Sequence, residues 1–268
     1  GQLGKNDTSN RSNPSQVGAL TNWSKIAAGS HSLAVKTDGS LWAWGNNGQG
    51  QLGNGTLTHK SSPIQIGALT NWSQVFVMDE TSFAIKTDGT LWAWGDNSTY
   101  QLGDGTAVNK SSPIQIGAAT TWSKISVFND DVYGSYSVMA LRTDGTLWAW
   151  GRAEAGQLGE GSSGFMVALS TPTQIGALTN WSKISGSRAI KTDGTLWAWG
   201  NNWDGQLGDG STTYRSSPIQ IGALTTWAEV AKGQNYTFAV KTDGTLWAWG
   251  SNYYGQLGFS PTTGPVKI

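Results

Sequence analysis

The residue types that carry most catalytic chemistry are scarce in this chain. It has two histidines, His31 and His59, and no cysteine. Two isolated histidines make neither a metal centre nor a catalytic triad. The lack of cysteine removes disulfides, thiolate metal sites and thiol nucleophiles. We expect His31 to be a packing or hydrogen-bonding residue and His59 to lie in a polar loop. The sequence therefore predicts no catalytic residue, and an enzyme is the last of the alternatives.

Oxygen-bearing side chains follow successive Leu-Gly pairs, at Asn54, Asp104, Glu160 and Asp209. They could be a ring of cation ligands, but a whole repeat separates each from the next, so we expect Asx-type turns. Residues 129–131 with Asp79 and Glu80 are a weaker calcium candidate, because their spacing matches no cation loop. The glycine-rich segments precede no helix and imply no phosphate loop. We expect no metal and no cofactor.

Aromatic residues in polar loops could instead support recognition. Trp203 and Asp204 lie in the segment Asn-Asn-Trp-Asp-Gly, and the other candidates lie in loops that differ between repeats. An aromatic ring with polar neighbours suits sugar stacking or a protein hot spot. The alternative is that these rings cover the edge of the core. The predicted ligand-binding residues are Trp203, Asp204, Tyr100, Tyr253, Tyr254, Tyr133 and Phe165.

These loops must be held by a scaffold, and the scaffold is a repeat. The segment Thr-Asp-Gly-Ser/Thr-Leu-Trp-Ala-Trp-Gly occurs five times and ends at Gly45, Gly95, Gly151, Gly200 and Gly250, at intervals of 50, 56, 49 and 50 residues. Such a period predicts one repeat domain over residues 1–268. The expected units are 18–67, 68–117, 118–176, 177–222 and 223–268, with 1–17 a partial unit.

Each unit reads as four short strands. In the second unit these are 74–78, 81–86, 90–94 and 113–116, and Asp88-Gly89 predicts a two-residue type I′ hairpin turn. Proline at the start of the fourth strand fits a sheet edge. Four antiparallel strands repeated about five times predict an all-β fold, a β-propeller of about five blades.

Tryptophan supplies the expected core. Of the 16 tryptophans, all but Trp203 recur three per unit. Trp92 and Trp94 should point to one face of their strand, with Leu91 and Ala93 on the other. A bulky face on one blade can then meet a flatter face on the next. A ladder of exposed, sugar-stacking tryptophans is the minor alternative.

The order of motifs from His31 to Gly53 resembles the RCC1-like (regulator of chromosome condensation) repeat, with Trp-Gly, Gly-Gln-Leu-Gly, a downstream proline and the Asp-Gly turn all in place. The resemblance covers nearly the whole chain and implies a β-propeller, most familiar with seven blades. It implies function only weakly. Family members include a nucleotide-exchange factor that also binds chromatin and an inhibitor of β-lactamases, and neither activity is carried over here. Near-identical repeats are typical of bacterial and phage surface proteins, so an extracellular, cell-surface or virion-associated location is favoured.

The two termini repeat the same part of the unit. Pro14–Val17 and Pro265–Ile268 both read as a fourth strand, so one of them is surplus. The ring could close with one redundant end, the chain could be part of a longer array, or the surplus strand could pair with another molecule.

Differences between the units gather on one face. The Asp-Gly turns and the Gly-Ala-Leu-Thr-Asn-Trp connections barely change, whereas the loop after the first strand and the Gln-Leu-Gly loop vary in length and sequence. Loops on a rigid scaffold carry recognition. We therefore expect a non-catalytic binding module for a protein or surface receptor. A lectin-like module and a structural module that assembles by strand exchange are the alternatives.

Charge and hydropathy restrict the partners. The formal net charge is zero, which favours neither nucleic acid nor an anionic membrane surface. No apolar run approaches the roughly 18 residues of a spanning helix. The expected partner is a protein or a cell-surface glycan, with self-association through the surplus strand as a further expectation.

Overall fold

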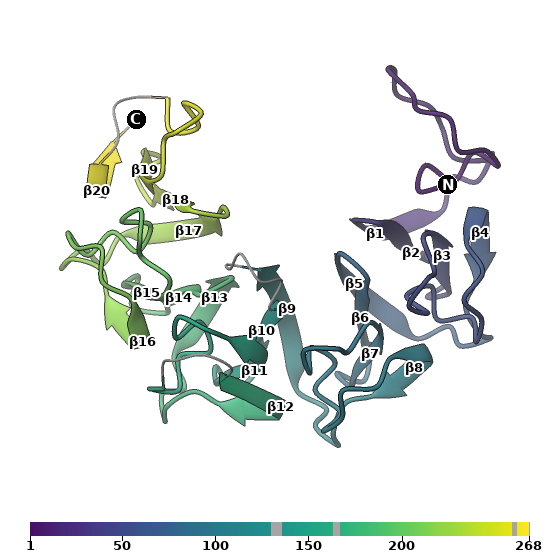
Figure 1. The fold of residues 1–268 in the computed structure, drawn as a ribbon, viewed down its shortest axis with the longest axis horizontal. Helices are drawn as coiled ribbons and strands as arrows, with labels where there is room; N and C mark the ends of the chain where they lie inside the picture. Colours follow the sequence, from purple (N-terminus) through teal and green to yellow (C-terminus); the bar gives the residue numbers. More distant parts are fainter. Residues whose placement is uncertain (130–135, 163–166, 259–261, 268) are drawn as a thin grey trace. The chain divides into compact units, whose positions relative to one another are not determined.

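The computed structural model describes residues 1–129, 136–162, 167–258 and 262–267, and these form five antiparallel sheets of four strands (Figure 1). We call each sheet with its loops a blade, numbered 1 to 5 along the chain. The all-β fold and the four strands per repeat are confirmed. The described residues contain no helix long and apolar enough to cross a membrane.

The chain divides into two compact units, Gly1–Ser123 and Lys124–Ile268. The strands of the first unit are β1 (Trp23–Ala28), β2 (His31–Lys36), β3 (Leu41–Gly45), β4 (Lys60–Gln65), β5 (Trp72–Met78), β6 (Thr81–Lys86), β7 (Leu91–Gly95) and β8 (Lys110–Gln115). They make blades 1 and 2. The predicted fourth strand of blade 2 began at Pro113, but pairing starts three residues earlier, and β8 lies at the sheet edge as expected.

Blades 3 to 5 follow. The first strand of blade 3 begins in the first unit and continues into the second. The strands are β9 (Trp122–Asn129), β10 (Tyr136–Arg142), β11 (Leu147–Ala153), β12 (Val167–Gln174), β13 (Trp181–Ser185), β14 (Arg188–Lys191), β15 (Leu196–Gly200), β16 (Arg215–Gln220), β17 (Trp227–Lys232), β18 (Tyr236–Lys241), β19 (Leu246–Gly250) and β20 (Thr262–Lys267). The C-terminal strand β20 pairs with β19 of its own repeat. Pro14–Val17, which was predicted as a fourth strand, forms no strand.

The Asp-Gly turn differs from its prediction. Gly39 N donates to the Lys36 carbonyl at 2.9 Å, and Lys36 N donates to the Ser40 carbonyl at 3.0 Å, so three residues form the loop. Gly39 has a φ of +79°, whereas Asp38 is not among the residues with positive φ. The predicted two-residue type I′ turn is therefore wrong, and the connection is a type I turn followed by a left-handed glycine. Asp38 instead accepts hydrogen bonds from the backbone and hydroxyl of Ser40.

The core lies between neighbouring blades, as the two faces of the third strand predict. Leu41 and Ala43 of blade 1 pack in one cluster with Trp72 and Trp94 of blade 2. Equivalent clusters join blades 3 and 4 and blades 4 and 5. A flat Leu/Ala face of one blade thus meets the tryptophan face of the next.

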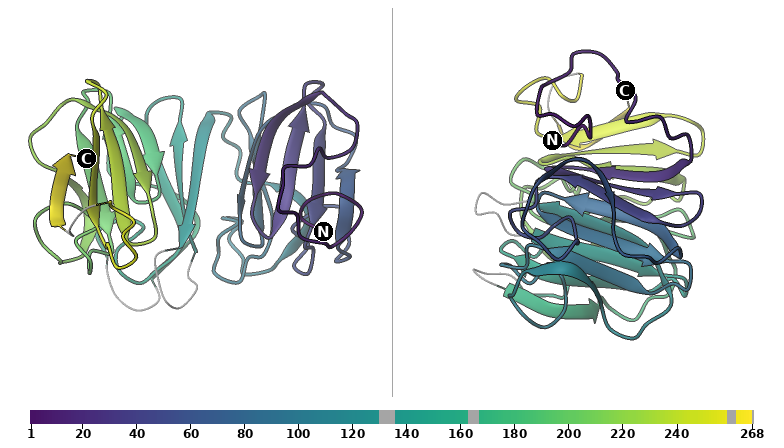
Figure 2. Two further views of the ribbon diagram at one scale, coloured as in Figure 1. Left: turned by 90° about the horizontal axis from the view of Figure 1, so that it is seen from above. Right: turned by 90° about the vertical axis from the view of Figure 1, so that its right-hand side faces the viewer.

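Within each unit the strand connections alternate between two ends (Figure 2). We call the end with the Gln-Leu-Gly loops the loop end and the other the turn end. At the loop end, Asp96 N donates to the Glu80 carbonyl at 2.9 Å, and Ser251 N donates to the Asn235 carbonyl at 2.8 Å. These bonds tie the start of the Gln-Leu-Gly loop to the loop between the first two strands.

Candidate functional site

The Gln-Leu-Gly loops are built around a buried asparagine. In blade 4, Asn202 Oδ1 accepts from Leu207 N at 2.9 Å, and its Nδ2 donates to the carbonyls of Ser211 and Thr213, both at 3.0 Å. Asn47 and Asn97 make the same bonds in their loops. Sequence reasoning missed this residue, although an asparagine two positions after Trp-Gly in four repeats was a usable signal. The buried amide gives a long irregular loop a fixed base.

Blade 4 displays two aromatic side chains on that base. Trp203 is 65% exposed, and its ring lies 6.1 Å from that of Tyr214, with the two planes inclined by 38°. The backbone beneath Trp203 is held, since its N–H donates to Asn201 Oδ1 at 3.1 Å. Asp204 is exposed and its N–H donates to Gln206 Oε1 at 2.9 Å. Tyr214 was not predicted, because it lies eleven residues further along the same loop.

Blade 5 places a second aromatic pair in the corresponding loop. Tyr253 and Tyr254 are 84% and 87% exposed, and their rings meet edge to face with centroids 4.8 Å apart. Leu257 N donates to Asn252 Oδ1 at 2.7 Å, as Leu207 N does to Asn202, although Asn252 is only partly buried. Both pairs lie at the loop end of the second unit, on blades that share a core cluster. We call Trp203, Tyr214, Tyr253 and Tyr254 the aromatic site.

The other predicted residues do not join this site. Tyr100 belongs to blade 2, in the first unit, is only half-exposed, and occupies the place of Gly50 with a φ of +63°. Its N–H and carbonyl both serve the turn, bonding to Asn97 and Gly103. Tyr133 and Phe165 lie outside the described residues.

His31 has a structural role, as predicted. It is fully buried, with Nε2 2.6 Å from Ser82 Oγ and Nδ1 3.2 Å from the Asp79 carbonyl. Burial lowers the pKa of His31 to about 4, and the hydrogen bond to Asp79 opposes this only in part. His59 accepts a bond from Asn47 N at 2.8 Å through Nδ1, in the place that Asn109 fills in blade 2. Both histidines therefore support loops.

The buried His31 predicts a pH-dependent stability. Its folded pKa lies below the unfolded value of about 6.5, so the unfolded chain binds the extra proton. The contribution to the free energy of unfolding is complete above pH 6.5 and falls by about 3 kcal/mol as the pH drops toward 4. Urea unfolding at pH 7 and pH 4.5 should show this loss in the wild type. His31→Thr, which introduces the residue found at Thr81, should show much less of it, and an equal loss in both proteins would contradict the prediction.

Three of the four residues after Leu-Gly, Asn54, Asp104 and Asp209, form the predicted Asx-type turns, whereas Glu160 accepts from the Ser162 hydroxyl instead. Asp104 Oδ1 accepts from Thr106 N at 2.9 Å, and Asp209 Oδ1 accepts from Ser211 N at 3.0 Å. Burial opposes ionisation of Asp209, but the bonds from Arg215 and Ser211 hold its pKa below the usual value. No group of three metal-ligating side chains occurs among the described residues. Asp130 and Asp131, which belong to the weaker calcium candidate, lie outside the described residues.

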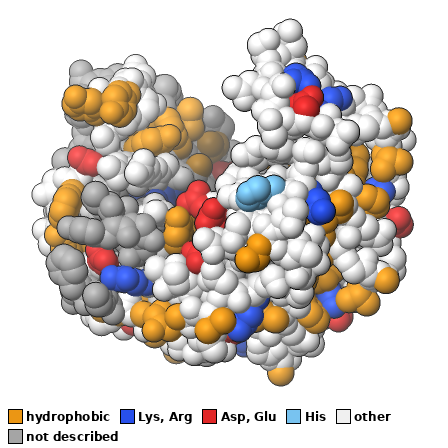
Figure 3. All heavy atoms as spheres, turned by 45° about the vertical axis from the view of Figure 1, so that its right-hand side comes forward, with side chains coloured by type: hydrophobic (Ala, Val, Ile, Leu, Met, Phe, Trp, Pro, Cys, Tyr) orange, Lys and Arg blue, Asp and Glu red, His pale blue; other side chains and the backbone are white. Residues whose placement is uncertain are grey.

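The turn end repeats another arrangement that sequence reasoning missed. Lys191 Nζ lies 3.6 Å from the centre of the Trp197 ring, and Trp197 Nε1 donates to Thr195 Oγ1, which in turn donates to Asp193. Burial lowers the pKa of Lys191. The same set occurs in blades 1, 2 and 5, which makes it part of the scaffold. On the face shown in Figure 3, lysine and arginine side chains are scattered and form no broad basic surface.

Comparison with known proteins identifies the repeat. The family model described as the regulator of chromosome condensation (RCC1) repeat matches residues 38–85, 88–127, 144–189 and 193–240, and a second model of that description matches 23–51 and 227–256. The chain is similar to the crystal structure of human WBSCR16, with 20% identity over 92% of this chain and 67% of that one and a TM-score of 0.77. It is also similar to Prp20p from Saccharomyces cerevisiae, with 18% identity over 91% and 76% and a TM-score of 0.52. The search of curated proteins gave no match.

Proposed function

The chain belongs to the family of regulator of chromosome condensation (RCC1) repeats, and we propose that it is a non-catalytic protein-recognition module that binds through the aromatic site. The observation that carries this proposal is the exposure of Trp203, Tyr253 and Tyr254 on loops whose bases are held by asparagine side chains. The repeat explains every other tryptophan as scaffold. Trp203 is the one that the scaffold does not need.

The physical chemistry of these side chains favours binding. An exposed Trp or Tyr offers a large apolar area with few rotatable bonds, so a partner gains contact area at little cost in side-chain entropy. Hot spots in protein interfaces are enriched in these two residues. The exposed Asp204 beside Trp203 adds a polar rim.

Related proteins support a protein as the partner. Prp20p has reported binding properties to Gsp1p and histones, and another structure shows yeast RCC1 (Prp20) with Kap60 bound. A lectin with one sugar site per blade is less well supported, because Gly48, Ser98 and Glu154 occupy the position of Trp203 in blades 1 to 3.

The test is Trp203→Ala against a matched control. Because Trp203 is 65% exposed, we expect the melting temperature to stay within about 2 °C of the wild type. Removal of a hot-spot aromatic costs about 2 kcal/mol of binding, so Kd should rise about thirtyfold. Leu178→Ala is the control, since Leu178 is a similarly exposed apolar residue at the turn end.

The partner is first identified by affinity capture with wild-type protein and quantitative mass spectrometry, with Trp203→Ala as the negative bait. Kd for the purified partner is then measured for all three proteins. Equal affinities for wild type and Trp203→Ala, or an equal loss in Leu178→Ala, would reject the aromatic site. A glycan array that binds wild type and not Trp203→Ala would replace the protein partner with a carbohydrate.

A further inference from the structure

The turn ends of the blades show how this chain holds a basic side chain. In blade 4, Lys191 Nζ lies 3.6 Å from the centre of the Trp197 ring. Burial lowers the pKa of Lys191, and the negative charge of Asp193 opposes this effect. In blade 3, the Arg142 guanidinium lies at the same distance, 3.6 Å, from the Trp148 ring. A tryptophan face with a carboxylate nearby therefore holds either kind of basic side chain in this fold.

The Gln-Leu-Gly loop of blade 4, residues 201–215, presents the same two groups to solvent. Trp203 is 65% exposed, and the next residue, Asp204, is exposed as well. The other charged side chains of this loop bind each other, because Arg215 donates to Asp209 from Nε at 2.8 Å and from Nη2 at 2.5 Å. Residues 251–258 of blade 5 include no charged residue. Within these described loops, Asp204 is thus the one charged group that has no ion-pair partner.

Tyr214 replaces a residue that supports the loop in other blades. His59 Nδ1 and Asn109 Oδ1 each accept from the backbone N–H of the buried asparagine, at 2.8 Å. Tyr214 occupies the same position in blade 4, but its hydroxyl is at the far end of the ring and cannot replace these acceptors. It is 42% exposed, and its ring lies 6.1 Å from that of Trp203. The position therefore displays a second aromatic ring in blade 4 instead of supporting the loop.

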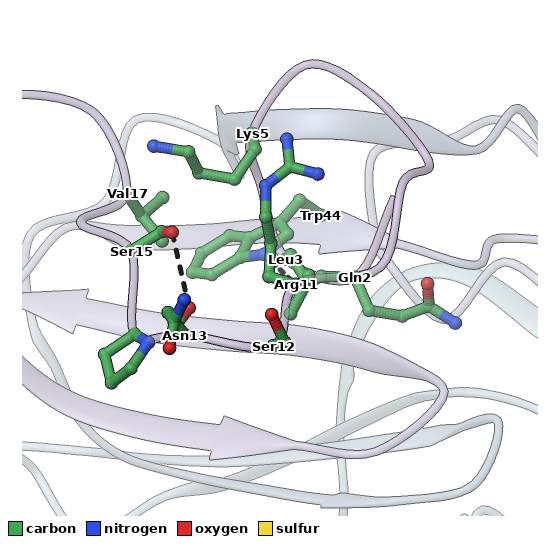
Figure 4. A pocket seen from close by; sticks show the side chains of 10 residues that line it. Gln2, Leu3, Lys5, Arg11, Ser12, Asn13, Ser15, Val17 and Trp44 are labelled. Carbon is green, nitrogen blue, oxygen red and sulfur yellow. Dashed lines mark hydrogen bonds between the residues drawn. The ribbon is translucent and has the colours of Figure 1, made fainter.

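The pocket on blade 1 in Figure 4 does not offer this combination. Lys5, Arg11 and Trp44 are among the residues that line its volume of about 470 Å³. Arg11 pairs with Asp7, and Lys5 Nζ donates to the Gln16 carbonyl. Trp44 is only 8% exposed. These residues therefore present neither an unpaired carboxylate nor an open tryptophan face to a basic ligand.

We propose that the aromatic site binds an arginine side chain of its protein partner. The guanidinium stacks on the exposed face of Trp203 and donates to the Asp204 carboxylate. The assignment rests on the recognition function proposed above, since it names the group that the same site takes from the partner. Arginine is favoured over lysine because a guanidinium is planar, donates two parallel hydrogen bonds to a carboxylate and is more weakly hydrated than an ammonium group.

The first test is a selection from a library of random peptides displayed on phage. Peptides are selected on the wild type and depleted on Trp203→Ala. We expect arginine to be enriched about threefold over the input library among the peptides that require Trp203. Peptides that require Trp203 without this enrichment, or with lysine enriched in its place, would overturn the arginine assignment and leave the proposed function intact. If no peptide requires Trp203, the aromatic site and the arginine assignment both fail.

An enriched peptide then tests the contact with Asp204. Replacing its arginine by citrulline removes the positive charge and keeps the shape of the side chain. We expect this change to raise Kd about tenfold, and Asp204→Asn to raise Kd for the original peptide about tenfold, because each removes the same charge-assisted contact. The two changes together should raise Kd little more than either alone. Losses that multiply would show that the arginine binds away from Asp204.

Asp7→Asn is the matched control for Asp204→Asn. It removes a partly exposed carboxylate from the first unit, far along the chain from the aromatic site, and changes the net charge equally. Its Kd should equal that of the wild type. Sodium chloride should weaken binding by the wild type and Asp7→Asn alike, and should affect Asp204→Asn less. An equal rise in Kd in both variants would mean that net charge attracts the peptide, and would overturn the role of Asp204.

Discussion

Gly194→Ala is expected to destabilise the second unit by at least about 4 kcal/mol, a loss seen only for severe structural conflicts. Gly194 has a φ of +77°, and a Cβ there would lie 2.1 Å from the Thr225 carbonyl oxygen of the following connection. That oxygen belongs to the backbone and cannot rotate away. The turn at Gly194 also positions the first strand of blade 5, because Trp227 N donates to the Gly194 carbonyl at 3.1 Å. Urea unfolding followed by tryptophan fluorescence measures the loss.

Gly244→Ala is the matched control for Gly194→Ala. Residues 191–200 and 241–250 have identical sequences, and Gly244 also has a positive φ, of +81°. A Cβ at Gly244, however, meets no atom of the described residues within 4 Å. This variant should therefore lose only the cost of a left-handed alanine, about 1–2 kcal/mol. Equal losses in both variants would show that the turn, and not its packing on the next repeat, limits stability.

The fold could be predicted because the sequence pattern of each strand recurs in five repeats. Hydrophobic alternation placed Leu91 and Ala93 opposite Trp92 and Trp94, and the structure confirms that the two faces meet between blades. The hairpin was predicted as type I′ because Asp-Gly suits that turn. It forms a three-residue loop because the Asp carboxylate bonds the backbone and hydroxyl of the residue after glycine, as Asp193 does with Thr195. Turn propensity alone does not predict that these side-chain hydrogen bonds will favour a different turn.

The candidate site was predicted in part, for a physical reason. Trp203 breaks a repeat that explains every other tryptophan, so it stood out. Tyr214 did not, because the buried Asn202 and the Arg215–Asp209 pair close the loop and the two rings then lie 6.1 Å apart. Tyr100 was grouped with the others by its loop, although it fills a glycine position of a different unit. Position along a loop is visible in a sequence, but the way a loop returns upon itself depends on buried polar bonds.

Trp199→Ala is expected to cost about 4 kcal/mol of the free energy of unfolding, in the range for loss of a buried aromatic. Trp199 is fully buried, packs in the cluster between blades 3 and 4, and donates through Nε1 to the Gln157 carbonyl at 2.9 Å. Trp44, Trp94 and Trp249 make the equivalent bond to the preceding Gln-Leu-Gly segment. This side chain therefore couples one repeat to the next.

Trp199→Phe separates the two contributions of this residue. Phenylalanine keeps most of the apolar contact but cannot donate to Gln157, so we expect a loss of about 1–2 kcal/mol, the cost of an unmade buried hydrogen bond. Because repeat proteins unfold cooperatively through interfaces between neighbours, Trp199→Ala should also broaden the urea transition. A loss below about 1 kcal/mol in Trp199→Ala, with an unchanged transition width, would mean that the contact between blades 3 and 4 does not depend on this ring. The matched comparison is Trp203→Ala, in which a tryptophan of the same unit is removed without an expected effect on stability.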